Sequence, residues 1–330
     1  MTQRTIRYGI IGFGAFAERA IAPAIRRSKD STLVALQKRS AETARRKADE
    51  FGVPLAFSTA EEMVRHPDVD AVFIVSANSA HCPETITAAT AGKHVIVEKP
   101  MALNVGEGTR MIEACAQNNV RFMVGHMVRL SPLVQRIKAI IKSGQIGVVK
   151  AIRTEFWYDG RQSHRPWLLD RAVAGGGPVF DIGVHCLDTI RYLLGEEPAH
   201  VASVVSPAPT ATATEESAYV TLKFPAGTLA SIFCSYTAPV RRSFIEVIGT
   251  EALITANDFT LSGHLGRLTY IKGKANNPAP PVVEEIQVPD LYVEEVSQFT
   301  AWILGGPEPE LTGRNALNNQ RVIDRALGFT

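Results

Sequence analysis

The sequence predicts an α/β protein: an N-terminal doubly wound parallel sheet, followed by an α+β domain with a mainly antiparallel sheet. Three observations support this prediction. A glycine-rich turn at 12–17 joins a strand to a helix, and strands then alternate with helices as far as about residue 125. From Val201 to Val288, by contrast, strands follow one another with turn signals between them. We therefore divide the chain into domains 1–125 and 126–330, and we allow for the last helix packing back on the first domain.

The composition is that of a soluble globular protein. The 330 residues are 45% hydrophobic and 21% charged, and the net charge of +2 gives no reason to expect a nucleic acid or an anionic membrane as partner. The four cysteines are scattered without a C-x-x-C pair, so we expect reduced thiols and neither disulfides nor a metal site. The N-terminus leads directly into a strand, and no apolar run reaches the roughly 20 residues of a membrane span. These features predict a cytoplasmic protein.

The first strand, Ile6–Ile11, runs into a glycine turn and a helix that extends to about Arg26. The turn has the G-x-G-x-x-A form of the dinucleotide fingerprint. Its first glycine permits a tight turn, its second lets a pyrophosphate approach the backbone, and the alanine lets the helix pack on the strand. A plain turn between two core elements is the alternative. The context of strand, turn and helix favours a Rossmann cofactor site that includes Gly12, Phe13, Gly14, Ala15 and Phe16.

The end of the second strand, Thr32–Leu36, distinguishes between nicotinamide cofactors. NAD-binding domains usually carry a carboxylate here for the ribose 2′-hydroxyl. This chain has Gln37 and then Lys38, Arg39 and Ser40, with two cations and no carboxylate. The cations are suited to a 2′-phosphate, although a solvated loop would have the same composition. We therefore expect NADP in preference to NAD.

Further β–α units predict the rest of the parallel sheet. The strand that ends at Val75 is followed by polar residues, of which Ser76, Asn78 and His81 are candidates for contact with the cofactor. An N-cap role for Asn78 and a packing role for His81 are the alternatives. The predicted elements are strands Ala71–Val75, Val95–Val97 and Arg121–Val124 and helices 80–91 and 105–118.

The strand Val95–Val97 ends in Glu98-Lys99-Pro100, which places a lysine at the carboxyl edge of the sheet. Pro100 stops the strand because it has no N–H to donate, and it favours an extended conformation at Lys99. A charged residue at a strand end is usually only solvated. Here it lies at the edge where open α/β sheets bind ligands, so Lys99 is a candidate catalytic residue.

In the second half, a glycine triplet at 175–177 precedes a predicted helix, Val179–Leu194. Asp181 and His185 lie four residues apart and share one face of this helix. Metal ligands, a catalytic pair and a structural first turn are the alternatives, and metal is the weakest because no third ligand is evident. The other predicted elements are helices 132–142, 293–304 and 314–327, a strand at 148–158, and loops at 207–214 and 274–281.

These motifs appear in the order seen in the Gfo/Idh/MocA oxidoreductases, which include glucose–fructose oxidoreductase and inositol dehydrogenase. The chain resembles this family over nearly its whole length, through Gly12-Phe13-Gly14, Asn78, His81, Glu98-Lys99-Pro100 and the glycine triplet with Asp181 and His185. The resemblance implies a nicotinamide-binding Rossmann domain and a second domain with a large open sheet, which serves substrate binding and oligomerisation. It also implies a sugar or polyol substrate held between the domains. A homodimer or homotetramer is expected, since one face of a broad sheet would stay uncovered.

The resemblance also implies roles for individual residues. Lys99, Asp181 and His185 surround the reacting carbon, and the Lys99–Pro100 bond is expected to be cis. Related reductases often have Trp-Arg before the glycine triplet, whereas Trp167 is followed here by Leu168, which puts a guanidinium contact to the nicotinamide side in doubt. Further predicted cofactor contacts are Glu98, Lys99, Arg129 and Trp167. The predicted substrate contacts are Lys99, Tyr158, Arg165, Asp181 and His185, with Arg161, His164 and Tyr236 as further candidates.

We expect hydride transfer between nicotinamide and a sugar-like alcohol or carbonyl. His185 would act as general base in oxidation and as general acid in reduction, because imidazole titrates near neutral pH. Lys99 would donate a hydrogen bond to the reacting oxygen. Alternatively, Lys99 and His185 share the transfer of the proton. Two other functions remain open: an oxidoreductase acting on a non-sugar carbonyl or diol, and a non-catalytic NAD(P)-binding sensor.

Overall fold

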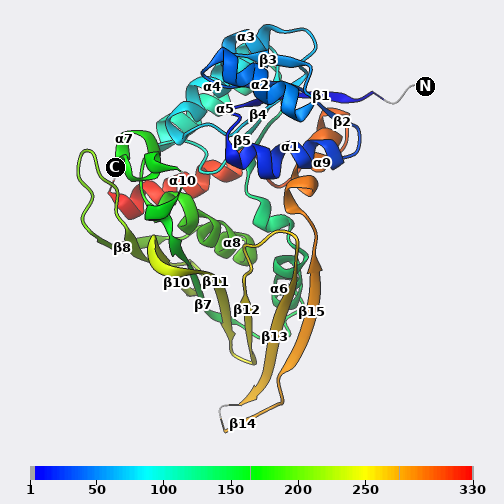
Figure 1. The fold of residues 1–330 in the computed structure, drawn as a ribbon. Helices are drawn as coiled ribbons and strands as arrows, with labels where there is room; N and C mark the ends of the chain where they lie inside the picture. Colours follow the sequence, from blue (N-terminus) through cyan, green and yellow to red (C-terminus); the bar gives the residue numbers. More distant parts are fainter. Residues whose placement is uncertain (1–3, 164, 275, 329–330) are drawn as a thin grey trace. The chain divides into compact units, whose positions relative to one another are not determined.

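The structure, a computed structural model, describes residues 4–163, 165–274 and 276–328. By its internal contacts the chain forms two compact units. The first contains the residues up to His126 together with Tyr292–Gln320, and the second contains Met127–Leu291 together with the residues from Arg321 onward. Figure 1 traces the chain from blue to red through both units.

The first unit is built on a parallel sheet whose strand order in the described chain is β3-β2-β1-β4-β5-β6. The order reverses between β1 and β4, and open α/β sheets bind ligands at the carboxyl ends of such strands. The predicted doubly wound sheet is therefore confirmed. The strands are β1 (Ile6–Ile11), β2 (Ser31–Gln37), β3 (Leu55–Phe57), β4 (Ala71–Ile74), β5 (His94–Glu98) and β6 (Phe122–Gly125).

Helices cover both faces of this sheet (Figure 1). Neighbouring residues of β1 point to opposite faces, as the pleat of a strand requires. The Tyr8 hydroxyl lies 2.7 Å from Thr300 Oγ1 on α9, whereas Gly9 lies close to Met63 on α3. The helices of this unit are α1 (Ala22–Arg27), α2 (Ala41–Phe51), α3 (Ala60–Arg65), α4 (Asn78–Thr90), α5 (Val105–Gln117), α9 (Leu291–Ile303) and the first part of α10 (Gly313–Leu327).

Two local features differ from the sequence prediction. The helix after the glycine turn begins at Ala15 and contains a π-helical segment, η1 (Ala17–Ile21), directly before α1. Pro23 follows this segment and has no N–H for a regular helical hydrogen bond, which accounts for the irregular turn. The prediction also missed α2, β3 and α3. The three residues of β3 are all half-buried, so this strand has no alternation to detect.

The second unit contains a mixed sheet that is mainly antiparallel, with β7 and β10 as a parallel pair. In the described chain its order is β14-β13-β12-β11-β7-β10-β9-β8, with β15 paired to β13. Helices α6 and α8 pack on this sheet (Figure 1), and the predicted open sheet is confirmed. The strands are β7 (Val149–Asp159), β8 (His200–Ser206), β9 (Ser217–Lys223), β10 (Leu229–Ser235), β11 (Thr237–Gly249), β12 (Ala252–Asn257), β13 (His264–Lys274), β14 (Asn277–Pro278) and β15 (Val282–Val288).

The two longer helices at 132–142 and 179–194 agree with the predicted ranges, whereas the short helical segments of the second unit were not predicted. The predicted helix Val179–Leu194 consists of a π-helical start, η5 (Val179–Gly183), that continues into α8 (Val184–Leu194). The other helical elements are η2 (Met127–Leu130), α6 (Pro132–Lys142), η3 (Gly160–Gln162), η4 (Pro166–Leu169), α7 (Arg171–Ala174) and the end of α10.

All four cysteines are buried free thiols, which confirms the prediction of unpaired cysteines. Burial raises the pKa of Cys115 and of Cys186 to about 12, so both thiols are protonated near neutral pH. Within the described ranges, no helix is long and apolar enough to cross a membrane.

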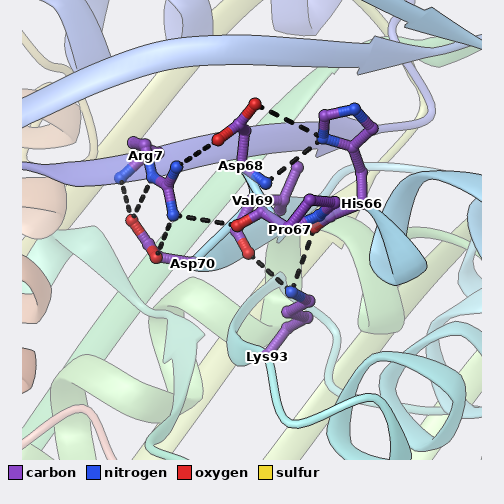
Figure 2. A network of polar contacts seen from close by, with 7 residues as sticks. All are labelled: Arg7, His66, Pro67, Asp68, Val69, Asp70 and Lys93. Carbon is purple, nitrogen blue, oxygen red and sulfur yellow. Dashed lines mark hydrogen bonds and ion pairs between the residues drawn. The ribbon is translucent and has the colours of Figure 1, made fainter.

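A polar network connects β1 to the loop before β4 (Figure 2). The network lies near the amino ends of these strands, away from the carboxyl ends described above. Arg7 Nε and Nη2 donate to the two oxygens of Asp70, at 2.9 and 3.0 Å, and the Arg7 amide donates to Asp70 Oδ2 at 2.9 Å. Lys93 Nζ donates to the carbonyls of His66 and Val69. Partial burial disfavours the ionised form of Asp70, but the bonds and charge of Arg7 outweigh it, and the pKa of Asp70 is lowered.

We expect Asp70→Asn to lower the free energy of unfolding of the first unit by about 1 kcal/mol at pH 7, because a partly exposed, charge-assisted contact is lost. The lowered pKa means that this stabilisation is complete above the ordinary carboxyl range and decreases as the pH falls through the folded value. Urea denaturation of both proteins measures the difference. Asp68→Asn is the matched control, since Asp68 also contacts Arg7 but its side chain is 58% exposed. An equal effect of the two variants would contradict this account.

Candidate active site

The glycine turn after β1 brings two segments of backbone into close approach. Gly12 has a φ of +80°, and a Cβ added there would lie 2.6 Å from the backbone nitrogen of Ser76. Only glycine accepts both conditions. A Cβ at Gly14 would instead meet a single atom, Gly12 O, at 3.8 Å. This open side of Gly14, beside the first turn of the helix that begins at Ala15, is a cradle suited to a pyrophosphate.

Gln37 at the end of β2 holds the glycine turn in place. Its backbone oxygen accepts the Phe13 amide at 2.9 Å, and its side-chain oxygen accepts the Gly12 amide at 3.0 Å. Its side-chain nitrogen donates to Ser58 O at 2.9 Å. The sequence analysis did not assign this role to Gln37. The available signal was a buried amide at a position where NAD-binding domains carry a carboxylate.

The two cations after Gln37 differ in their surroundings. Lys38 Nζ donates to the carbonyl of Phe13 at 2.6 Å and so reinforces the glycine turn. Arg39 is exposed, and Ser40 is the N-cap of α2, where its hydroxyl accepts the Thr43 amide at 3.3 Å. A guanidinium beside a capped helix N-terminus is suited to a phosphate group, because both favour negative charge.

The loop after β4 joins the glycine turn to the segment that carries Lys99. His81 is completely buried, with Nδ1 2.9 Å from Pro100 O and Nε2 3.2 Å from Ser76 O. Burial lowers the pKa of His81 to about 4, so the imidazole is neutral at neutral pH and donates to one of the two carbonyls. His81 therefore connects the loop after β4, at Ser76, with the loop after β5, at Pro100. Its predicted contact with a cofactor remains a prediction. Asn78 is the first residue of α4 and Ala77 is the N-cap, so the N-cap alternative for Asn78 is wrong.

Glu98 and Lys99 end β5 at the same edge of the sheet. Glu98 is buried, and its Oε2 accepts the Lys99 amide at 3.1 Å, whereas the Lys99 side chain is half-buried. The peptide bond between Lys99 and Pro100 is cis, as the resemblance implied. Within the first unit, the structure thus brings the glycine turn, Ser76, His81 and Lys99 to one edge.

In the second unit, Asp181 lies at the centre of a polar cluster with Tyr158 and Arg165. The Tyr158 hydroxyl donates to Asp181 Oδ2 at 2.8 Å, and Arg165 donates to both oxygens of Asp181 at 3.4 and 3.2 Å. The negative charge of Asp181 raises the pKa of Arg165, and burial together with Asp181 raises the pKa of Tyr158. Both side chains therefore stay protonated and act as donors. The cluster is a preformed arrangement of charge-assisted hydrogen bonds of the kind that recognises hydroxyl groups.

Tyr236 extends this cluster. Its ring lies 5.4 Å from that of Tyr158, and Gly160 makes room for it, since a Cβ there would lie 2.4 Å from a ring carbon. The side chain is completely buried, and its hydroxyl interacts with Asp181. Burial, followed by the charge of Asp181, raises the pKa of Tyr236 well above its usual value, so the hydroxyl is a donor.

The glycine triplet supports the helix that carries Asp181 and His185. Glu215 Oε1 accepts the amides of Gly177 and Val179 at 2.9 and 3.2 Å, which caps the start of η5. A Cβ at Gly177 would lie 1.9 Å from Glu215 O, so this position requires glycine. Glu215 is completely buried, and burial raises its pKa. The sequence analysis missed Glu215, because its partners lie 36 and 38 residues away along the chain.

Three other predicted site residues of the second unit are His185, Arg129 and Trp167, and each has contacts within that unit. His185 is buried, with its ring centroid 6.2 Å from that of Phe156. Arg129 forms a buried bidentate pair with Asp188, with both distances at 2.7 Å. The Arg165 guanidinium lies 5.9 Å from the centre of the Trp167 ring. His164 lies outside the described residues. The predicted cofactor contacts of Arg129 and Trp167 remain predictions.

Comparisons with known proteins agree with this architecture. Residues 6–126 match the GFO/IDH/MocA oxidoreductase family with an NAD-binding Rossmann fold, and residues 134–255 match the GFO/IDH/MocA C-terminal domain. The chain therefore belongs to the GFO/IDH/MocA family of NAD(P)-dependent oxidoreductases, and the predicted family and enzyme class are confirmed.

Individual relatives extend over almost the whole chain. The sequence is 28% identical to a 1,5-anhydro-D-fructose reductase from Ensifer adhaerens, covering 94% of this chain and 92% of the reductase. It is 26% identical to a D-xylose 1-dehydrogenase (NADP+) from Haloferax volcanii, covering 96% and 95%. The fold is similar to that of an aldose–aldose oxidoreductase from Caulobacter crescentus crystallised with glycerol, with a TM-score of 0.87, 30% identity and coverage of 99% and 98%.

We expect Gly12→Ala to weaken NADPH binding more than tenfold, because the new Cβ displaces Ser76 from the glycine turn. Fluorescence titration of the cofactor measures the change. Gly52→Ala is the matched control: Gly52 also has a positive φ, of 58°, but a Cβ there has nothing within 4 Å. Alanine at a positive φ lowers the stability of both variants by about 1 kcal/mol, but only Gly12→Ala places an atom against the backbone of Ser76. Unchanged NADPH binding in Gly12→Ala would contradict the proposed cradle.

Proposed function

We propose that this protein transfers hydride between NADP and the C–OH or C=O carbon of a sugar- or polyol-like substrate, with Lys99 and His185 handling the proton. The observation that carries the proposal is the cluster of Asp181 with Tyr158 and Arg165, which offers a carboxylate and protonated donors to substrate hydroxyls. His185 belongs to the same helix as Asp181. The names of the reductase, the dehydrogenase and the aldose oxidoreductase above support a sugar-like substrate.

The protein residues position the substrate and move the proton. Nicotinamide, when bound, supplies or accepts the hydride. The His185 imidazole takes the hydroxyl proton in oxidation and returns a proton in reduction, since imidazole titrates near neutral pH. The Lys99 ammonium donates a hydrogen bond to the reacting oxygen and stabilises the negative charge that develops there. Asp181 accepts a hydrogen bond from a neighbouring hydroxyl and orients it.

The proposed preference for NADP depends on the residues at the end of β2 and directly after it. Gln37 stands where a carboxylate would repel a 2′-phosphate, and its side chain is engaged with the glycine turn. Arg39 is exposed beside the N-terminus of α2, and Ser40 caps that helix. Lys38 contributes less in this proposal, because its ammonium binds Phe13 O.

The homo-oligomeric state remains a prediction, and an aromatic surface on the second sheet supports it. Tyr219 is 57% exposed and stacks on Phe233, with ring centroids 4.6 Å apart. Phe233 lies 5.8 Å from Trp157, and Arg242 lies over Trp157. Phe233 and Trp157 are half-buried beside the exposed Tyr219, and an aromatic patch of this kind typically marks a protein interface. The cytoplasmic location likewise remains a prediction.

We expect the purified protein to turn over at least one member of a panel of aldoses, anhydrosugars and polyols with NADP+ or NADPH. Lys99→Met and His185→Ala should each lower kcat by about 10²–10⁴, because a proton-handling group is removed. NADPH affinity measured by fluorescence should change far less. Lys93→Met is the matched control, since the Lys93 ammonium binds two loop carbonyls. Wild-type kcat in Lys99→Met or in His185→Ala would contradict the assignment, and turnover of a cyclic diol alone would contradict the sugar-like substrate.

Arg39→Ala should lower the ratio of kcat/KM for NADPH to kcat/KM for NADH by about 10- to 100-fold, the loss expected for one charge-assisted contact. Arg45→Ala is the control, because Arg45 is an exposed arginine on α2, the helix that follows Arg39, and it pairs with Asp49. An unchanged ratio in Arg39→Ala would remove this residue from the recognition of a 2′-phosphate.

A further inference from the structure

The first unit contains a buried carboxyl group that the reaction above does not use. Glu295, on α9, has no exposed surface, and neither of its side-chain oxygens has a hydrogen-bond partner among the described residues. A carboxylate in such a place loses its hydration without replacement, which is very costly. The residue therefore needs an explanation beyond packing.

Glu295 and Glu98, the residue before Lys99, both approach Gly125 at the end of β6. A Cβ added at Gly125 would lie 3.2 Å from Glu295 Oε1 and 3.4 Å from Glu98 Oε1. The two carboxyl groups thus converge on one point at the carboxyl edge of the sheet. Because Gly125 has no side chain, both carboxyl groups fit beside it.

Two buried carboxyl groups this close cannot both be ionised at neutral pH. Burial, followed by the negative charge of Glu98, raises the pKa of Glu295 well above its usual value. Glu98 is the member suited to the negative charge, because its Oε2 already accepts the Lys99 amide at 3.1 Å. Glu98 Oε1 approaches the same point at Gly125 as Glu295 Oε1, so it is the candidate acceptor for a proton on Glu295.

We propose that Glu98 and Glu295 share one proton as a buried carboxyl pair, and that Glu295 is thereby a positioning residue for Lys99. The proton on Glu295 holds the Glu98 carboxylate, and that carboxylate holds the backbone amide of Lys99. The link to catalysis rests on the proposed function of Lys99, whereas the shared proton does not.

Infrared spectroscopy at pH 7 tests the shared proton without any turnover. The wild-type protein should show a protonated carboxylic acid band that is absent from Glu295→Gln. In Glu98→Gln this band should remain but shift, because the hydrogen-bond acceptor changes from a carboxylate to an amide. Identical wild-type and Glu295→Gln spectra would overturn the proposal.

Kinetics test the positioning role. Glu295→Gln keeps a neutral donor and should retain kcat within about threefold, whereas Glu295→Met should lower kcat by about tenfold or more, because small displacements of a catalytic group are costly. The NADPH dissociation constant should stay within about twofold in both variants, since the glycine cradle is untouched. Thr300→Val is the control: it removes the bonds from α9 to Tyr8 and Ser31 and should lower the melting temperature without changing kcat.

The outcomes separate the two proposals. Wild-type kcat in a folded Glu295→Met, or a loss of kcat in Thr300→Val equal to that in Glu295→Met, would overturn the positioning role. Failure of the wild-type protein to turn over any substrate would overturn the proposed function, and the infrared comparison would still decide whether the proton is shared.

Discussion

Gly12 and Ser76 approach so closely at the switch point of the first sheet that no side chain fits between their backbones. The other features of this edge follow from that contact. Gln37 accepts the Gly12 amide and Lys38 donates to the Phe13 carbonyl, so both residues hold the glycine turn at the end of β2. His81 then links Ser76 to Pro100, so the position of the turn is coupled to the segment that carries Lys99. A chain of short polar contacts therefore aligns the phosphate cradle with the end of β5.

Buried carboxyl groups are compensated in different ways in the two units. Asp181 has donors in Tyr158 and Arg165, and Asp188 has a bidentate partner in Arg129. Glu215 accepts two amides at the start of η5. Such compensation is required because a buried charge without partners costs more than the folded state tolerates. Glu295, for which protonation is the proposed solution, is the exception that led to the carboxyl pair.

Sequence patterns predicted most of the fold, because long apolar strands and amphipathic helices carry strong local signals. The glycine fingerprint, the end of β5 at Lys99 and the helix with Asp181 and His185 were all located correctly as elements. The short β3 was missed, since three half-buried residues have no period. Gln37, Glu215 and Glu295 were missed as well. Their importance lies in contacts between distant parts of the chain, for which a single sequence contains no periodic signal.

The sequence departure at Leu168 illustrates the same limit. Leu168 replaces the arginine that often follows the tryptophan in related reductases, which made a guanidinium contact doubtful on sequence alone. In the structure the Arg165 guanidinium lies beside Trp167 and bonds Asp181, so a guanidinium reaches this cluster from a position three residues before Leu168. The motif alone did not predict that contact.

We propose that Lys99 and His185 act on the same reacting oxygen. A crystal structure of the protein with NADP+ and a substrate identified by turnover would locate both side chains relative to that oxygen. We expect the Lys99 ammonium and the His185 imidazole each to lie about 2.6–3.2 Å from the oxygen on the carbon that exchanges hydride. A productive complex in which either group is remote from that oxygen, with no bridging water, would contradict it.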